Sequence, residues 1–216
     1  MIILDNVHKR YKKNSGYSWV LKNVNLKINH GDKIAVVGSN GCGKSTLTRI
    51  ISGAEMPTIG TVKRHMTVSW PLAFSGAFQG GLTGIDNIKF ICRLYNVDFR
   101  KSLAFIKEFS DLGDSLNDVV KYYSSGMRAR LAFALSMAVD FDCYIIDEVT
   151  AVGDDSFHNK CHEFLYGERG NKAMIIISHD RSYLLDHCEK SLLVRNGSVV
   201  MYDDVRNCLE DYDKNK

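Results

Sequence analysis

The apolar residues at the start of this chain are spaced as in β-strands. In residues 1–30 apolar and polar positions alternate, and this pattern predicts strands at about 2–7 and 20–28. Tyr11 lies between them, ahead of a polar segment at 12–18 that is predicted as a loop. The chain therefore begins with an antiparallel β part.

Short apolar runs later in the chain predict more strands, at 33–37, 61–70, 143–146 and 173–177. The dipeptide Asn196-Gly197 stands between the apolar triplets 192–194 and 199–201, a pattern typical of a β-hairpin. The polar segment 203–216 is predicted to form one short helix.

The spacing becomes helical between residues 80 and 140. Thr83 and Asp86 have the spacing of a capping box, and helices are predicted at about 85–95 and 100–112. Another helix starts near Tyr123 and carries one apolar face, formed by Met127, Leu131, Ala134, Leu135 and Ala138. We therefore expect an α/β fold in a single domain, 1–216, with a mixed β core at about 1–79 and 141–216 and an inserted helical subdomain at about 80–140.

A glycine-rich segment follows the predicted strand 33–37. Its sequence, Gly38-Ser39-Asn40-Gly41-Cys42-Gly43-Lys44-Ser45, fits the pattern G-x-x-x-x-G-K-[ST], and a helical pattern follows at 46–53. Such a loop wraps its backbone N–H groups around an anion, and the start of the helix adds partial positive charge. Lys44 can then reach the β- and γ-phosphates of a nucleotide, and Ser45 can ligate Mg²⁺. By itself the motif leaves open a chance glycine turn.

The composition excludes several classes of protein. A net charge of +3 over 216 residues does not favour nucleic acid as a partner. The six cysteines form no C-x-x-C pair, which favours free thiols in a reducing compartment. No apolar run approaches the roughly 20 residues that span a bilayer, so a cytosolic chain is expected, and any membrane role requires a separate membrane subunit.

A basic cluster lies near the start of the chain and is formed by His8, Lys9, Arg10, Lys12 and Lys13. It is either a solvated strand end or a contact for nucleotide phosphate or anionic lipid.

Three further groups of residues carry candidate chemistry. Asp147 and Glu148 end a buried strand, where an acid can hold Mg²⁺ and its neighbour can polarise water, although solvated acids fit equally well. His179 follows another apolar strand, where it can donate to a γ-phosphate or be structural. Ser124 and Gly126 stand at a helix start, as an anion site or as an ordinary N-cap.

The order of these motifs along the chain resembles the ATP-binding-cassette (ABC) ATPase family, whose fold is of the P-loop NTPase type with a RecA-like core. The resemblance covers essentially the whole chain and assigns the remaining roles. It implies that the loop from Gly38 to Thr46 binds ATP, with Lys44 also counted as catalytic, and that Tyr11 stacks on adenine. Asp147 matches the Mg²⁺ ligand, Glu148 the catalytic base and His179 the switch histidine.

The resemblance also assigns residues that face a second subunit or a membrane partner. Gln79 matches the glutamine loop, which senses Mg²⁺ and the transport subunit. Ser124-Ser125-Gly126-Met127 matches the signature usually written Ser-Gly-Gly-Gln, and Asp154 matches an aspartate at the dimer contact. The chain departs from the pattern at Ser125, Met127 and Val149, and the interval after Gln79 is shorter than usual.

These matches imply a homodimer that closes around two ATP molecules and Mg²⁺, at the cytoplasmic face of a bacterial inner membrane. Details such as Trp70-Pro71, Phe78-Gln79-Gly80 and the run 147–154 look like the ATPase subunits of Gram-negative capsular polysaccharide exporters, and a chain that stops soon after the hairpin favours this short type. Two copies of an integral membrane permease would then handle the polysaccharide. The segment 70–81 and the following helix are expected to dock this permease, with core packing as the alternative for their aromatic residues.

Other functions stay open at this stage. The cargo could be O-antigen, another lipid-linked glycan or a small solute, because the membrane subunit selects it. A soluble cassette ATPase acting on DNA or the ribosome would usually need long coiled-coil insertions or two fused cassettes, and neither is seen. A regulatory module without turnover is disfavoured by Glu148 and His179.

Overall fold

An antiparallel sheet of three strands begins the fold. The computed structural model describes residues 1–14, 16–72, 79–147 and 155–215. Strand β1 (Ile2–Lys13) lies between β2 (Gly16–Ile28) and β4 (Ile59–Arg64). The alternation predicted at 2–7 and 20–28 is seen in the buried side chains of the first two strands, which are Ile2, Leu4, Val7, Leu21, Val24, Leu26 and Ile28.

The predicted polar loop at 12–18 is wrong for most of its length. Lys12 pairs with Tyr17 and Lys13 with Gly16, so β1 and β2 continue almost to the tip of the hairpin. The side chains in this part of the strands are charged or exposed, so they show no alternation of apolar and polar residues from which a strand could be predicted. Tyr11 consequently stands within β1, opposite Ser18, rather than ahead of a loop.

The second sheet has the strand order β5-β6-β7-β3-β8-β9. Its strands are β3 (Lys33–Val37), β5 (Val68–Pro71), β6 (Cys143–Asp147), β7 (Ala173–Ile177), β8 (Lys190–Arg195) and β9 (Ser198–Tyr202). Strand β3 pairs in parallel with both β7 and β8, and β6 pairs in parallel with β7. The predicted hairpin around Asn196-Gly197 is confirmed, since β8 and β9 are antiparallel.

One predicted strand, 61–70, proves to be two strands in different sheets. β4 ends at Arg64 in the first sheet, and β5 starts at Val68 in the second. The chain is turned between them by Asp142, whose carboxylate accepts hydrogen bonds from the Thr67 backbone N–H at 2.9 Å and from its hydroxyl at 3.0 Å. This contact joins residues that are 75 positions apart, and no local pattern could reveal it.

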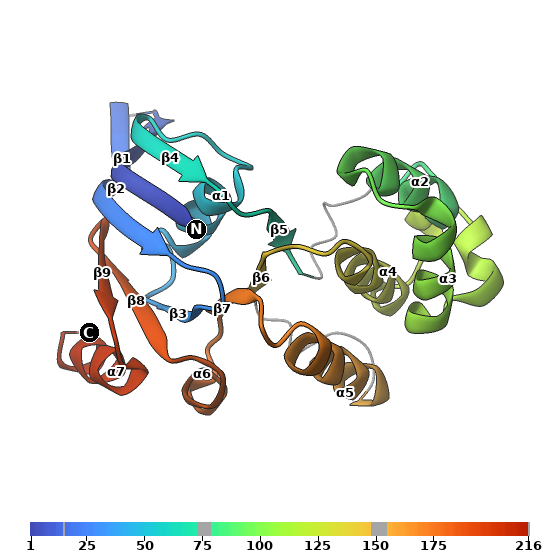
Figure 1. Ribbon diagram of the computed structural model, residues 1–216. Coiled ribbons are helices and arrows are strands. Elements are labelled where there is room, and N and C mark those ends of the chain that lie inside the picture. Colours follow the sequence, from blue (N-terminus) through green and yellow to red (C-terminus); the bar gives the residue numbers. More distant parts are fainter. Residues whose placement is uncertain (15, 73–78, 148–154, 216) are drawn as a thin grey trace. The chain divides into compact units, whose positions relative to one another are not determined.

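Three helices belong to a compact unit that comprises 1–69, 141–148 and 171–216 and holds these strands except the end of β5. They are α1 (Lys44–Ser52), α6 (Arg181–His187) and α7 (Val205–Lys214), the last where a terminal helix was predicted (Figure 1). Helix α1 buries Leu47, Ile50 and Ile51 in a core shared with both sheets. Gly53 ends it with a φ of 86°, and the Arg64 side chain donates to the last carbonyl oxygens, those of Ile50 and Ile51.

The second compact unit comprises 70–140 and 149–170 and is helical. Its described helices are α2 (Gly84–Tyr95), α3 (Phe99–Ser110), α4 (Ser125–Ala138) and α5 (Asp155–Glu163), with 3₁₀ turns η2 (Gly113–Asn117) and η3 (Val120–Tyr122) and a π-helical turn η5 (Phe164–Glu168). The Thr83 side chain caps α2 by accepting from the Asp86 N–H, at the position that the sequence predicts. Aromatic rings fill the centre of this unit, where Phe109 stacks on Phe133 with 5.8 Å between ring centroids. Within the described ranges, no helix combines the length and apolarity needed to cross a bilayer.

Candidate functional site

The glycine-rich loop leads from β3 into α1, as the sequence predicts. Gly38 is required by close packing, because a Cβ atom there would lie 2.6 Å from the Cys42 sulfur and 2.6 Å from the Val194 carbonyl oxygen. Gly43 is required by its backbone, whose φ of 117° at the N-cap of α1 disfavours any other residue. The loop therefore turns tightly, and the N–H groups that open α1 form a site suited to an anion.

Lys44 extends along this loop. Its ammonium group donates to the carbonyl oxygens of Gly38 at 2.6 Å and Ser39 at 3.1 Å. A cavity of about 490 Å³ opens beside it, lined by Val20, Asn40, Gly41, Gly43, Lys44, Ser45, Thr46, Asp147, Ile177 and His179. Residues of three separate motifs thus share one cavity within one compact unit.

The sheet explains why these motifs meet. Strands β6, β7 and β3 are parallel neighbours, so their carboxyl ends lie at the same edge. Asp147 is the last residue of β6 and pairs with Ile177, the last of β7. His179 follows two residues later, and the glycine-rich loop follows β3.

The side chains in this cavity suit a magnesium nucleotide. Mg²⁺ usually takes one or two protein oxygens and completes its shell with phosphate oxygens and water. The Ser45 hydroxyl and the Asp147 carboxylate are such oxygens, and both residues line the cavity. In the described part of the chain, this cavity included, no group of three or more His, Cys, Asp or Glu side chains is arranged to hold a metal.

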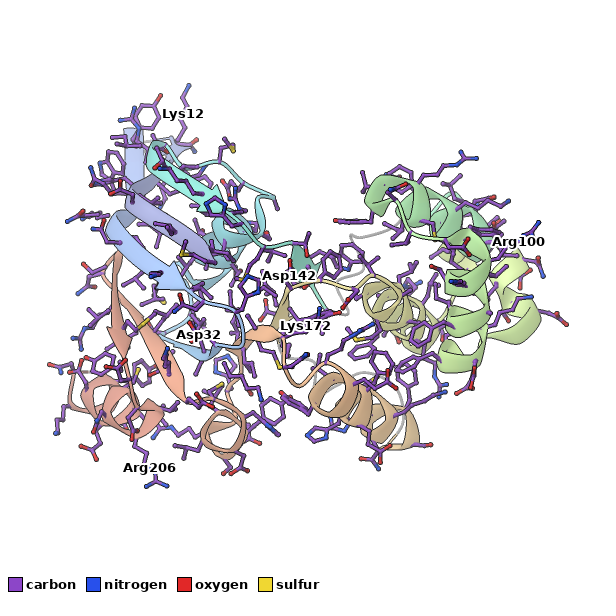
Figure 2. The ribbon with its side chains drawn as sticks, viewed as in Figure 1. Lys12, Asp32, Arg100, Asp142, Lys172 and Arg206 are labelled. Carbon is purple, nitrogen blue, oxygen red and sulfur yellow. The ribbon has the colours of Figure 1, made fainter. Side chains whose placement is uncertain are left out.

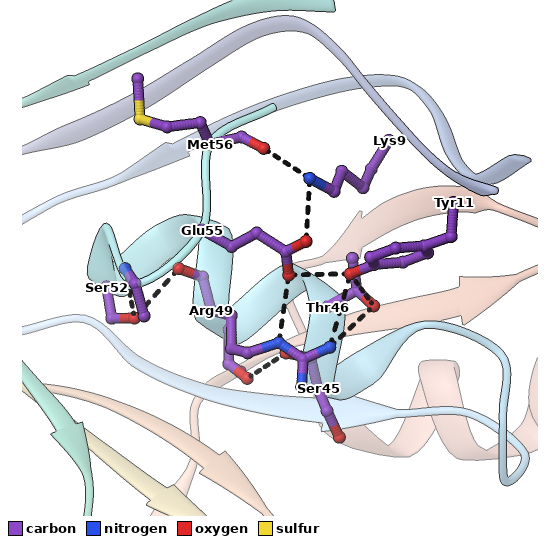
Figure 3. A network of polar contacts seen from close by, with 10 residues as sticks. Lys9, Tyr11, Ser45, Thr46, Arg49, Ser52, Glu55 and Met56 are labelled. Atoms are coloured by element: carbon purple, nitrogen blue, oxygen red, sulfur yellow. Dashed lines mark hydrogen bonds and ion pairs between the residues drawn. The ribbon is translucent and has the colours of Figure 1, made fainter. Parts of the chain in front are cut away.

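Tyr11 is held beside the helix that follows the loop. Its hydroxyl donates to the Glu55 carboxylate at 2.7 Å and lies 3.4 Å from the Thr46 hydroxyl. Lys9 pairs with the same carboxylate at 2.8 Å (Figure 3). The predicted adenine platform is thus fixed to a residue of the phosphate cavity, Thr46.

Comparisons with known proteins agree with this geometry. The sequence matches the family described as ABC transporter over residues 21–151. The chain belongs to the ABC transporter family.

Two bacterial relatives match this ABC chain along its full length. The ATP-binding protein BexA of Haemophilus influenzae is 52% identical, with 99% of each chain covered. The capsule polysaccharide export ATP-binding protein CtrD of Neisseria meningitidis serogroup B is 51% identical, with 98% of each covered. The predicted ABC ATPase identity is therefore confirmed.

Solved structures confirm the fold. The ATP-binding cassette MJ0796, solved as a dimer bound to ADP and phosphate, gives a TM-score of 0.76 at 23% identity, covering 94% of this chain and 98% of the cassette. An ATP-binding subunit of another ABC transporter gives a TM-score of 0.79 at 16% identity, covering 99% of each chain. The expected α/β cassette, with a β core and an antiparallel β part, is seen in both the sheets and these neighbours.

The residues predicted to form the signature motif stand at the start of α4, in the second unit. Ser124 is the N-cap, and its hydroxyl accepts a hydrogen bond from the Met127 N–H at 3.1 Å. Ser124 and Ser125 are exposed. The preceding Tyr123 is buried and donates from its hydroxyl to the Ser115 carbonyl oxygen. Burial, with help from the Asp118 charge, raises the pKa of Tyr123 to about 12, so its proton stays in place as a donor.

Gln79 also belongs to the second unit. Its backbone is held at both ends by the buried Asn87, whose side chain accepts from the Gln79 N–H at 2.8 Å and donates to the Gln79 carbonyl at 3.1 Å. Gln79 itself is exposed to solvent. Two further predicted site residues, Glu148 and Asp154, lie outside the described residues, as do residues 73–78 of the predicted docking segment.

Sequence reasoning missed one part of the site. A smaller cavity of about 180 Å³ adjoins Gly38, Lys44, Ser178 and His179 and is closed by residues of α6 and α7, namely Arg181, Leu184, Leu209 and Tyr212. Arg181 donates two hydrogen bonds to Asp213, at 2.7 and 2.6 Å. Helix α7 is amphipathic, but its place beside the cavity that His179 lines depends on tertiary structure alone.

Proposed function

We propose that this chain is the ATP-hydrolysing subunit of an ABC exporter whose cargo is a capsular polysaccharide. The observation that carries the enzymatic part is the single cavity that unites Lys44, Ser45, Asp147 and His179. The cargo is supported by the full-length relatives, one of which is described as a capsule polysaccharide export protein. A third relative, the polysialic acid transport ATP-binding protein KpsT of Escherichia coli, is 42% identical over 99% of each chain.

In this proposal the loop N–H groups and Lys44 bind the β- and γ-phosphates of ATP. Ser45 and Asp147 would hold Mg²⁺, with Gln79 as a further ligand or sensor, and the ion would supply positive charge next to the phosphates. Glu148 accepts a proton from the attacking water, whose oxygen bonds to the γ-phosphorus as the bond to the ADP oxygen breaks. His179 donates a hydrogen bond to the γ-phosphate. Tyr11 stacks on the adenine ring.

We infer that two copies of the chain enclose two ATP molecules. The loop around Lys44 in one copy would face Ser124, Ser125 and Gly126 of the other, with Asp154 at the contact. Support comes from the exposed start of α4, which presents hydroxyl and N–H groups suited to a phosphate. The dimeric cassette among the solved neighbours has the same fold.

The partner in the membrane would dock on the second unit, around residues 70–81 and α2. Helix α2 supports this placement, because its large apolar side chains Phe90 and Leu94 are 51% and 60% exposed. Docking would hold the chain at the cytoplasmic face of the inner membrane. No nucleic acid enters this proposal.

A complementation experiment tests both the ATPase activity and the proposed cargo. A Haemophilus influenzae strain lacking BexA would receive either the wild-type chain or the Glu148→Gln chain, and surface capsule would be measured with capsule-specific antibody. Restoration by the wild type alone is the expected result. If the purified wild-type chain hydrolyses ATP but restores no capsule, and instead restores O-antigen to an exporter mutant, the alternative cargo is correct.

A further inference from the structure

Glu55 is the centre of a polar network that joins the β1–β2 hairpin to helix α1. Its carboxylate receives the Lys9 ammonium at 2.8 Å, the Tyr11 hydroxyl at 2.7 Å and the Arg49 guanidinium at 3.2 Å. Figure 3 shows all three donors converging on this one acid. Glu55 is therefore the acceptor that these three donors share, and its removal would take the carboxylate from all of them.

The network fixes Tyr11 at two points. The hydroxyl is tied to Glu55, in the loop after α1, and is also 3.4 Å from the Thr46 hydroxyl in the first turn of α1. The Lys9 ammonium lies 5.2 Å from the centroid of the Tyr11 ring, two residues away on the same strand. Lys9 itself is held by the Met56 carbonyl oxygen at 2.8 Å.

This arrangement leaves a defined surface for a base. Because Lys9 covers one face of the ring, a base must stack on the opposite face. The position of that face relative to the phosphate cavity is set by Thr46, which lines the cavity. The ring is thus oriented before any nucleotide arrives, and a ring already in its binding rotamer loses less entropy when a base stacks on it.

The charge of Glu55 suits this role. Burial acts to raise its pKa, but the hydrogen bonds from Lys9 and Tyr11 outweigh that effect and hold the pKa of the carboxyl below its ordinary value. The acid is therefore ionised at neutral pH. A hydrogen bond to an ionised acceptor is shorter and stronger than one between neutral groups, which agrees with the 2.7 Å contact to Tyr11.

We propose that Glu55 is a positioning residue for nucleotide binding, which acts through Tyr11 by holding the adenine-stacking ring in register with the phosphate loop. The inference rests on the proposed function of Tyr11 and deepens it. Glu55 touches neither base nor phosphate in this account. Its effect should consequently appear only with ligands that carry a base.

The test compares two ligands on the purified full chain, Mg²⁺ with ATP and Mg²⁺ with inorganic tripolyphosphate, by calorimetric titration. Glu55→Ala and Tyr11→Phe should each weaken ATP binding by roughly 3- to 10-fold, the usual net effect of one hydrogen bond, and leave tripolyphosphate binding unchanged. Tyr11→Ala should weaken ATP binding by about 5- to 100-fold, because it removes the stacking surface. In the Tyr11→Ala background, adding Glu55→Ala should have no further effect on ATP binding.

Asp32→Ala is the matched control. Asp32 is also a partly buried acid paired with a lysine, Lys190, at 2.8 Å, but it lies far from the hairpin tip that carries Lys12 (Figure 2). This variant should lose stability while keeping the wild-type affinities for both ligands. It shows whether loss of an ion pair in this unit changes nucleotide affinity by itself.

The outcomes distinguish the role of Tyr11 from the role of Glu55. Unchanged ATP affinity in Tyr11→Ala would overturn the stacking role of Tyr11, and the role of Glu55 with it. A loss in Tyr11→Ala without any loss in Glu55→Ala would overturn the role of Glu55 alone, as would an equal loss of tripolyphosphate binding. Should Glu55→Ala fail to fold, Tyr11→Phe decides, because it removes only the hydroxyl group; wild-type ATP affinity in that variant overturns the proposal.

Discussion

The Lys44 ammonium group donates to the Gly38 carbonyl oxygen at 2.6 Å, so the lysine lies along the loop that it is expected to complete. In that position its charge stands in the cavity shared with Asp147 and His179. A charged donor of this kind contributes more to phosphate binding than a neutral one.

We expect Lys44→Ala to weaken MgATP binding by about 10- to 100-fold, the usual range for a hydrogen bond to a charged group, and to abolish measurable turnover. Titration with a fluorescent ATP analogue measures the first effect and phosphate release the second. Lys27→Ala, at an exposed position on β2, is the control and should behave as wild type. Unaltered affinity in Lys44→Ala would remove the lysine from the phosphate site.

Cys42 should be the thiol that inactivates the enzyme when alkylated. It lies within the phosphate loop and is partly exposed, whereas the other five cysteines are buried. Burial raises the pKa of Cys143, Cys161 and Cys188 to about 12, so these thiols stay protonated and unreactive. We expect N-ethylmaleimide to abolish ATP hydrolysis, MgATP to protect, and Cys42→Ala to keep activity and resist the reagent. Equally fast inactivation of Cys42→Ala would assign the effect to another cysteine.

Asp32 should make stability depend on pH in acid. Burial acts to raise its pKa, but hydrogen bonds from Lys190 and from the Asn29 N–H lower the pKa below the ordinary value of 3.8. A group whose pKa is lower in the folded state stabilises the fold above the unfolded value, and this stabilisation is lost as the pH falls through the folded value. Thermal unfolding should therefore show Asp32→Asn less stable than wild type at pH 7, with the difference closing as the pH falls below 3.8. A difference that stays constant with pH would contradict the ion-pair explanation.

The features that the sequence predicts best are those set by neighbouring residues. The strand, glycine loop and helix around Lys44 follow from local pattern, and the meeting of Asp147 with His179 follows from parallel strands that share an edge. The network at Tyr11 could not be predicted in this way, because Glu55 is 44 positions away. The division of 61–70 into two strands depends equally on a distant residue, Asp142.

Helix α7 borders the small cavity that His179 also lines, and this arrangement gives another prediction. Arg181 follows His179 closely and holds Asp213 of α7 by two hydrogen bonds, while Tyr212 lines the small cavity with His179 and Lys44. Asp213→Arg should lower kcat by displacing α7, with only a small loss of stability because the pair is about half exposed. The double variant Arg181→Asp, Asp213→Arg restores opposite charges and should recover kcat. If the double variant is as slow as the single one, the ion pair does not position α7.

The catalytic assignment leads to a prediction about dimerisation. Glu148→Gln removes the proposed base but leaves Lys44, Ser45 and Asp147 to bind MgATP. Hydrolysis should fall by about 10²- to 10⁴-fold, the usual effect of losing a general base. The ATP-bound dimer should then accumulate, seen as an ATP-dependent shift from monomer to dimer in size-exclusion chromatography. Near-normal steady-state hydrolysis by Glu148→Gln would falsify the role of the glutamate.

The same background tests whether Ser124 faces the nucleotide of the other copy. Ser124 is the N-cap of α4 and is exposed to solvent, so the Ser124→Arg chain should fold normally. In the dimer, its bulky arginine would enter the phosphate site of the other copy. Glu148→Gln with Ser124→Arg should therefore stay monomeric in ATP, and so should Glu148→Gln with Lys44→Ala. A mixture of these two chains has one intact composite site, from Lys44 of the first chain and Ser124 of the second, and should yield a weak heterodimer. An ATP-independent dimer that tolerates Ser124→Arg would instead mean that the two copies associate through another surface, because only a shared nucleotide makes assembly depend on both residues.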